Sequence, residues 1–143
     1  MKHRASLLLL AIALLTGVAT LQEVQAQGPV QAPASAAAAS ASGFTVLQGR
    51  WVRPDGGYVI TIRNIDADGK LEAGYANPNP LPFSRAESVR SGGVLRVFLE
   101  LRAGGYNGST YTLEYDPSND TLKGVYFQAV AKQKFDVVFA RAR

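Results

Sequence analysis

The chain has 143 residues, with 15 Lys or Arg against 11 Asp or Glu, so its formal net charge is +4. It has no cysteine, and its one histidine, His3, lies in a segment that we expect to be removed. Together these exclude disulfides, thiol catalysis, histidine general-base chemistry and the usual nitrogen and sulfur metal sites. The basic residues are scattered singly, which favours a mixed soluble surface over nucleic-acid binding.

The N-terminus predicts a secretory signal peptide over residues 1–26. A basic start over residues 2–4 precedes an apolar run over residues 7–15, and Val24-Gln25-Ala26 is a small-x-small cleavage site. The run is shorter than the roughly 20 residues that cross a bilayer, and no cysteine follows it for lipid attachment. We therefore expect a bacterial type of exported protein, periplasmic or secreted, without a membrane anchor.

Residues 27–43 are rich in Ala, Ser, Pro and Gln and carry neither charge nor aromatic ring. Such a segment cannot bury enough apolar surface to fold, which predicts a disordered linker. One β domain over residues 44–143 follows. About 100 residues suffice for a single hydrophobic core, which must hold this domain without disulfides.

From Phe44 onward, apolar residues recur with a period of two, the period of half-buried strands. No segment shows a helical stripe. The inward-facing positions predict eight strands: Leu47, Gly49 and Trp51; Tyr58, Ile60 and Ile62; Leu71, Ala73 and Tyr75; residues 83–90; Leu95, Val97, Leu99 and Leu101; Tyr111, Leu113 and Tyr115; Leu122, Gly124 and Tyr126; Phe135, Val137, Phe139 and Arg141.

The links between these strands are too short for parallel crossovers, so neighbouring strands must be antiparallel. The simplest arrangement is all-β, an eight-stranded up-and-down meander barrel, which removes both sheet edges. A two-sheet sandwich is the alternative.

Link lengths distinguish the two ends of such a barrel. The second, fourth and sixth links are tight turns, whereas the first, third, fifth and seventh include the two longest, residues 77–82 and 103–108. In a meander these two sets lie at opposite ends. The looser end is the expected mouth for a ligand.

The first and last strands of the predicted domain carry two sequence features, Gly49-Arg50-Trp51 in the first and Arg141 near the C-terminus in the last. By parity Arg141 faces inward, so its guanidinium needs a partner, and stacking on Trp51 together with bonds to carbonyls would supply one. Fraying of Arg141 into solvent is the alternative. The pattern resembles the calycin group of avidins and lipocalins, which opens with Gly-x-Trp and packs this tryptophan under a late arginine.

Over residues 47–77 the order of motifs is most similar to the avidins, and Tyr75 and Asn77 match positions that these proteins use for biotin. The chain departs from the family elsewhere. It has one tryptophan where avidins line their site with several, and Arg53 and Gly57 replace polar biotin contacts. The resemblance therefore implies a calycin-type barrel and ligand-binding role, but not biotin as the ligand.

Four tyrosines carry the ligand hypothesis. Tyr58, Tyr75, Tyr111 and Tyr126 all fall near the looser end with inward parity, and Asn77 and Gln128 lie close by in the chain. Phenols offer apolar area and an orienting hydroxyl. The alternative is that the rings simply plug the barrel top.

The long fifth link supplies a second candidate, in which Tyr106 and Asn107 contact a ligand or partner. An ordinary long hairpin turn is the alternative. Outward parity also collects apolar residues, and Phe98, Val125 and Phe127 are candidates for self-association or for docking of another protein.

No nucleophile stands beside a base and no inward carboxylate pair is predicted, so we expect no enzyme, cofactor or metal. The first hypothesis is an exported binding protein for a small, partly apolar ligand, without a nucleic-acid partner. The alternative is a periplasmic protein-interaction module, such as a protease inhibitor or an envelope-complex subunit.

Overall fold

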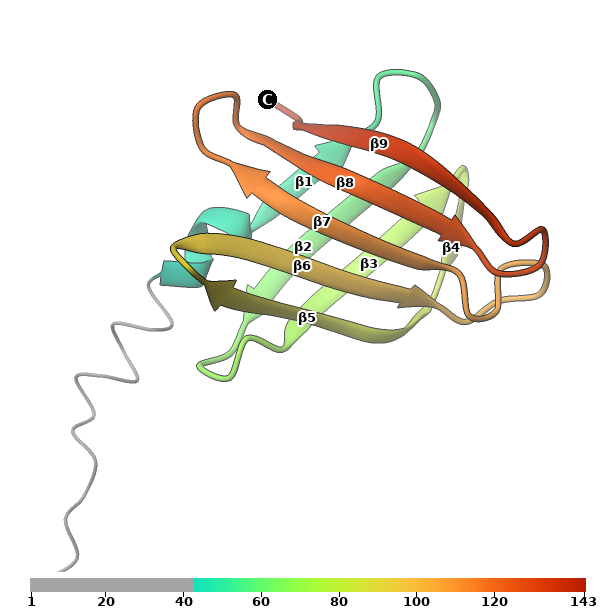
Figure 1. Ribbon diagram of the computed structural model, residues 1–143, viewed down its shortest axis with the longest axis horizontal. Coiled ribbons are helices and arrows are strands. Elements are labelled where there is room, and N and C mark those ends of the chain that lie inside the picture. Colours follow the sequence, from blue (N-terminus) through green and yellow to red (C-terminus); the bar gives the residue numbers. More distant parts are fainter. Residues whose placement is uncertain (1–42) are drawn as a thin grey trace, which may run out of the picture. The chain divides into compact units, whose positions relative to one another are not determined.

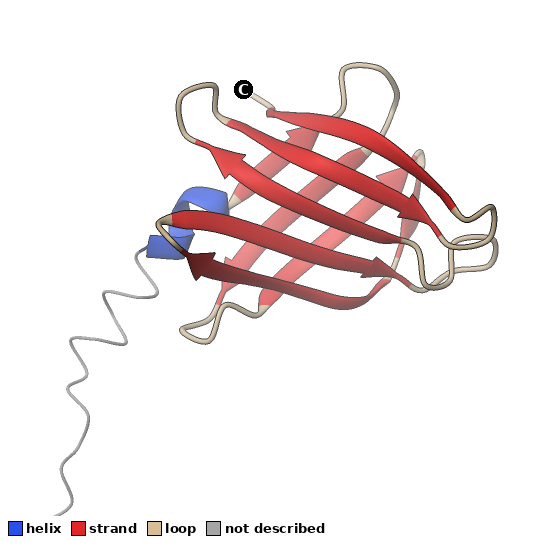
Figure 2. Ribbon diagram, viewed as in Figure 1, coloured by secondary structure: helices blue, strands red, loops and turns tan. Residues whose placement is uncertain are grey.

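The structure is a computed structural model that describes residues 43–143. The predicted signal peptide and almost all of the predicted linker lie outside the described residues. The described part is all-β apart from one short 3-10 helix, η1 (Thr45–Leu47), at its start (Figure 2). Its nine strands are β1 (Gly49–Val52), β2 (Val59–Ile65), β3 (Leu71–Asn77), β4 (Asn79–Leu81), β5 (Phe83–Ser91), β6 (Val94–Leu101), β7 (Thr110–Asp116), β8 (Thr121–Gln128) and β9 (Gln133–Arg141).

All strand pairs are antiparallel, and the strands form one sheet in the order β4-β3-β2-β1-β9-β8-β7-β6-β5. Strands β5 to β9 cross in front of β1 to β4 (Figure 1). The first strand pairs with the last, which brings Trp51 opposite Arg141 and Val52 opposite Ala140. The predicted antiparallel barrel is therefore confirmed in its coarse form, as a single nearly closed sheet rather than two stacked sheets.

The strand count differs from the predicted eight because of the third link. Residues 77–82, predicted as a loop, contain strand β4, which pairs with the end of β3 from Tyr75 opposite Leu81 to Asn77 opposite Asn79. Pro82 separates β4 from β5. Proline donates no backbone hydrogen bond and therefore interrupts a ladder.

Strands β3 and β5 leave a seam in the wall, which we define as residues 71–74 facing residues 83–86. On the side of the seam towards the looser end of the barrel, β4 pairs with β3. On the side towards the tight-turn end, which we call its lower end, Lys70 and Glu87 form a bridge. At this lower end the Ser88 backbone N–H and hydroxyl both donate to the Gly69 carbonyl, at 2.6 and 3.0 Å. No ladder joins the two sides of the seam in the described chain, so the barrel is closed at both ends of this pair and open between them.

The inward positions of the strands form one core, as the period of two predicts. Its fully buried members are large apolar side chains from six of the nine strands, β1, β2 and β6 to β9: Trp51, Ile60, Ile62, Val97, Leu99, Leu101, Tyr111, Leu113, Leu122 and Phe139. Leu47 of η1 packs against the core at the tight-turn end of the barrel and is also fully buried.

Phe135 departs from the inward pattern, since 44% of it is exposed. The reason is local, because β9 pairs with β1 only at Arg141 and Ala140 and its first half has no neighbour on that side. Phe135 thus lies at the rim of the barrel beside Tyr126.

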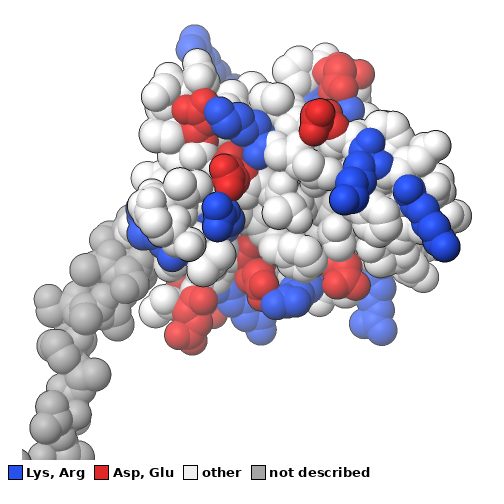
Figure 3. Space-filling view, viewed as in Figure 1, with Lys and Arg blue, Asp and Glu red and all other residues white. Residues whose placement is uncertain are grey.

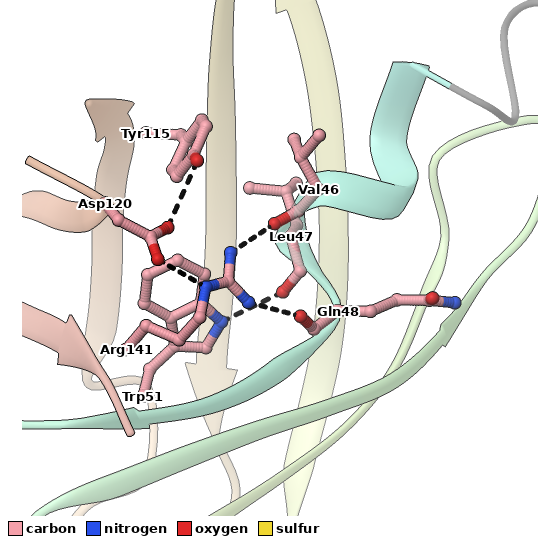
Figure 4. A network of polar contacts seen from close by, with 7 residues as sticks. All are labelled: Val46, Leu47, Gln48, Trp51, Tyr115, Asp120 and Arg141. Atoms are coloured by element: carbon pink, nitrogen blue, oxygen red, sulfur yellow. Dashed lines mark hydrogen bonds and ion pairs between the residues drawn. The ribbon is translucent and has the colours of Figure 1, made fainter. Parts of the chain in front are cut away.

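The tight-turn end is held by Arg141, as Figure 4 shows. Its guanidinium lies 4.1 Å from the centre of the Trp51 ring and donates from Nε to Asp120 at 2.7 Å. Nη1 donates to the Gln48 carbonyl and Nη2 to the Val46 carbonyl, both at 2.5 Å. The Arg141 side chain keeps the pKa of the Asp120 carboxyl below its usual value. Arg141 does not fray into solvent. It joins the last strand, β9, to the residues just before the first strand, β1.

Candidate functional site

The other end of the barrel holds a cavity of about 270 Å³. We call it the mouth cavity and define it by its lining residues: Arg53, Tyr58, Tyr75, Asn77, Tyr106, Tyr126, Gln128 and Phe135. These residues lie in or next to the β1–β2, β3–β4, β6–β7 and β8–β9 links. The four looser links therefore meet at one end, as a meander requires.

The floor of the mouth cavity is a pair of buried phenols. The hydroxyls of Tyr75 and Tyr111 lie 2.9 Å apart, and the two residues are 4% and 1% exposed. Burial raises the pKa of Tyr111 to about 12, and burial together with the hydrogen bond to Tyr111 raises the pKa of Tyr75 further. Both phenols are therefore neutral across the physiological range, and one of the two hydroxyls donates its hydrogen bond to the other.

One wall of the cavity is a row of aromatic rings on neighbouring strands. Tyr111 of β7 stands opposite Tyr126 of β8, and Tyr126 stands opposite Phe135 of β9. The Tyr111 and Tyr126 rings stack with centroids 4.6 Å apart, and the Tyr126 and Phe135 rings stack at 6.2 Å. The row runs from the buried Tyr111 ring to the exposed Phe135 ring, so aromatic side chains lead from the solvent towards the floor.

Arg53, which follows β1, forms another part of the cavity lining. Its Nε and Nη2 donate to the Asp55 carboxylate at 2.8 and 2.5 Å, and its guanidinium lies 4.4 Å from the centre of the Tyr58 ring. The Arg53 backbone N–H also donates to the Tyr58 carbonyl at 3.0 Å. The β1–β2 link thus holds the guanidinium in place. The Asp55 hydrogen bond raises the pKa of Arg53 and lowers that of Asp55.

Ser109 joins two of the loops around the mouth. It is fully buried, its backbone N–H donates to the Tyr106 carbonyl at 2.8 Å, and its hydroxyl accepts from the Ala129 N–H at 3.1 Å. The β6–β7 and β8–β9 loops lie side by side (Figure 1). Ser109 follows a Gly-rich loop in the sequence, but only the fold shows that it is buried and which groups it bonds.

Six of the predicted site residues line the mouth cavity: Tyr58, Tyr75, Asn77, Tyr106, Tyr126 and Gln128. Tyr111 lies beneath it and meets it through Tyr75. Asn107 is exposed in the β6–β7 loop and does not line the cavity. Ligand contact through Asn107 stays a prediction.

Sequence reasoning missed Arg53 and Phe135 as lining residues. Arg53 lies in a link, where periodicity assigns no direction to a side chain, and Phe135 has the parity of the core. Both positions depend on how the loops of the barrel mouth come together.

The outer face of β6 to β8 carries the residues predicted for self-association, Phe98, Val125 and Phe127. Each is only partly exposed, and the Arg85 guanidinium covers Phe98 at 5.2 Å from its ring centre. Charged side chains stand around a stretch of uncharged surface on the face that Figure 3 displays. Association through this face stays a prediction.

Two other hollows, of about 470 and 480 Å³, lie on the outer wall. The first lies beside Gly43, where the described chain begins, and the second lies along the seam. Within residues 43–143 no cluster of three or more acidic or histidine side chains could hold a metal ion. No helix in this part of the chain is long and apolar enough to cross a membrane.

Comparisons with known proteins add no relative to this description. No family model, no curated protein and no solved structure matches the chain. The geometry of the mouth cavity is therefore what the functional argument rests on.

Proposed function

We propose that this domain is a non-enzymatic binding module that takes a small, partly apolar ligand into the mouth cavity. The observation that carries the proposal is the set of groups around the cavity. Four phenols, one phenyl ring, two carboxamides and one guanidinium surround about 270 Å³. Aromatic walls provide contact area and a few placed polar groups provide orientation, which is how small-ligand sites are built.

The tyrosines fall into two groups, and this supports a cavity at the opening that lies above a filled barrel interior. Tyr75 and Tyr111 fill the barrel interior and bond to each other, whereas Tyr58, Tyr106 and Tyr126 are only partly buried around the opening. The interior below the floor is packed with apolar side chains. A ligand would therefore sit at the mouth, and its size would be that of one or two rings rather than a long chain.

Two further parts of the proposal rest on the chain as a whole. Export is supported by the basic start, apolar run and cleavage site of residues 1–26. Calycin-type kinship is supported by the up-and-down strand order and by Trp51 beneath Arg141.

The test is native mass spectrometry of the protein purified from its own host. We expect a fraction of the wild-type protein to carry the added mass of a small molecule. Gln128→Trp, which fills the cavity from β8, should lose this mass. Lys123→Trp is the matched control, because Lys123 is an exposed residue of the same strand that does not line the cavity, and it should keep the added mass.

Two results would contradict the proposal. One is a wild-type protein that carries no added mass from any growth condition. The other is equal retention by the Gln128→Trp and Lys123→Trp variants, since a ligand in the mouth cavity cannot tolerate an indole in its place.

A protein partner at the rim is the second candidate function. It is favoured by two exposed apolar residues beside the mouth, Val130 at 69% and Phe135 at 44% exposure. Val130→Asp separates the candidates. It should weaken a protein complex and leave a retained small molecule unchanged.

A further inference from the structure

Among residues 43–143, Arg53 is the only charged residue that lines the mouth cavity, and no carboxylate in this part of the chain lines it. Its side chain is 14% exposed, while its partner Asp55 is 63% exposed. The positive group therefore lies within the cavity wall, and the negative group lies in water, where solvent screens it.

The guanidinium retains donors for a ligand. Asp55 occupies Nε and Nη2, and no acceptor among residues 43–143 bonds Nη1. Ring stacking on Tyr58 and the backbone bond to the same residue keep the group oriented. A planar guanidinium matches the geometry of a carboxylate, and such charge-assisted bonds are stronger than neutral ones.

The positive charge of Arg53 also acts on two tyrosines of the aromatic row, Tyr111 and Tyr126. It opposes the rise in the pKa of Tyr111 and of Tyr126 that burial causes. Burial still keeps the pKa of these two phenols above its usual value, so both are neutral near pH 7 and do not repel an anion. The Tyr126 and Phe135 rings supply apolar area that lines the same space.

Resting on the proposed function, the geometry points to a small planar aromatic carboxylate as the ligand class. The ring lies on the Tyr126–Phe135 wall, and the carboxylate accepts from Arg53. Binding forms no covalent bond and needs no co-reactant.

A charge-matched pair of probes tests this. 2-Naphthoate and 2-naphthamide have the same ring and nearly the same volume, but only the first is an anion at pH 7. By calorimetry, we expect wild-type protein to bind 2-naphthoate about ten-fold more tightly than 2-naphthamide. One charge-assisted hydrogen bond is enough to produce a difference in affinity of this size.

Substitutions of the two members of the Arg53–Asp55 ion pair should change the preference for the anionic probe in opposite directions. Arg53→Gln should abolish the roughly ten-fold preference for the anion, whereas Asp55→Asn should increase it because the guanidinium then has no competing carboxylate. Arg85→Gln is the matched control. Arg85 also pairs with a carboxylate, Glu87, and lies over an aromatic ring, but on the outer face, so its loss should leave both affinities unchanged.

The outcomes separate this inference from the proposed function. Equal binding of the two probes, unchanged in Arg53→Gln, overturns the anion site and leaves a small-ligand cavity standing. Binding of neither probe also overturns the anion site, while the retained mass seen by native mass spectrometry decides the proposed function independently. Circular dichroism of each variant shows that the barrel is folded before its affinity is compared.

Discussion

At the scale of single residues, Gly49 and Arg141 depend on each other. Gly49 has a φ of +135°, and a Cβ atom built on it would lie 2.7 Å from Nη1 of Arg141. The glycine thus makes room for the guanidinium that bonds the carbonyls of residues 46 and 48. This is a physical reason for a glycine two residues before the buried tryptophan, independent of any family.

Gly49→Ala should therefore destabilise the domain by about 1–3 kcal/mol, from backbone strain and displacement of Arg141. The free energy of unfolding from urea denaturation measures the effect. Gly57→Ala is the matched control, because a Cβ there meets nothing within 4 Å, and its effect should stay within about 0.5 kcal/mol. Equal stability of the two variants would mean that the Arg141 network does not support the fold.

At the scale of elements, the seam between β3 and β5 is a stretch of the barrel wall that no backbone ladder joins within residues 43–143. Gly69, with a φ of +84°, lies at its lower end so close to Ser88 that a Cβ would overlap the Ser88 carbonyl oxygen. Inside the wall, the Phe83 and Tyr75 rings pack with centroids 5.9 Å apart. Side chains close the seam where backbone hydrogen bonds do not.

Hydrogen exchange should show this directly. Amides of residues 71–74 and 83–86 that face the seam have no ladder partner, so we expect them to exchange well before the amides of β7, which is paired on both sides. Mass spectrometry of peptic fragments gives the comparison, with β7 as the internal reference. Protection of the seam amides equal to that of β7 would indicate a fully paired wall.

At the scale of the whole molecule, the two ends of the barrel have different roles. The tight-turn end is occupied by the Arg141 network and η1, and the looser end carries the mouth cavity. Between them lies the apolar core with the Tyr75–Tyr111 pair on top. Substitutions at the first end are expected to change stability, and those at the second to change binding.

Stability of the whole domain should fall at alkaline pH because of that pair. An unfolded tyrosine ionises near pH 10, whereas burial raises the pKa of folded Tyr111 to about 12 and that of Tyr75 also upward. The stabilising effect is fully present below about pH 10 and is lost as the pH rises through the folded pKa. Urea midpoints measured from about pH 8 to 12 should therefore decrease above about pH 10.

Tyr75→Phe provides the comparison for this pH dependence. It removes one of the two buried phenols and keeps the ring, so the alkaline loss of stability should be smaller than in the wild-type protein. A wild-type midpoint that does not change across this range would contradict the burial of both phenols.

The inward parity of Arg141, together with a family resemblance, predicted its meeting with Trp51. The alternation of residues and the lengths of the links by themselves predicted the antiparallel strands, the inward faces and the looser mouth. These follow from a side-chain period of two and from short links, which are local properties of the chain. The tertiary structure alone decided that residues 79–81 form a strand, that Phe135 lies exposed at the rim and that Arg53 enters the cavity wall. Each of these depends on which neighbours lie beside a residue at the end of a strand or in a link, where periodicity carries no information.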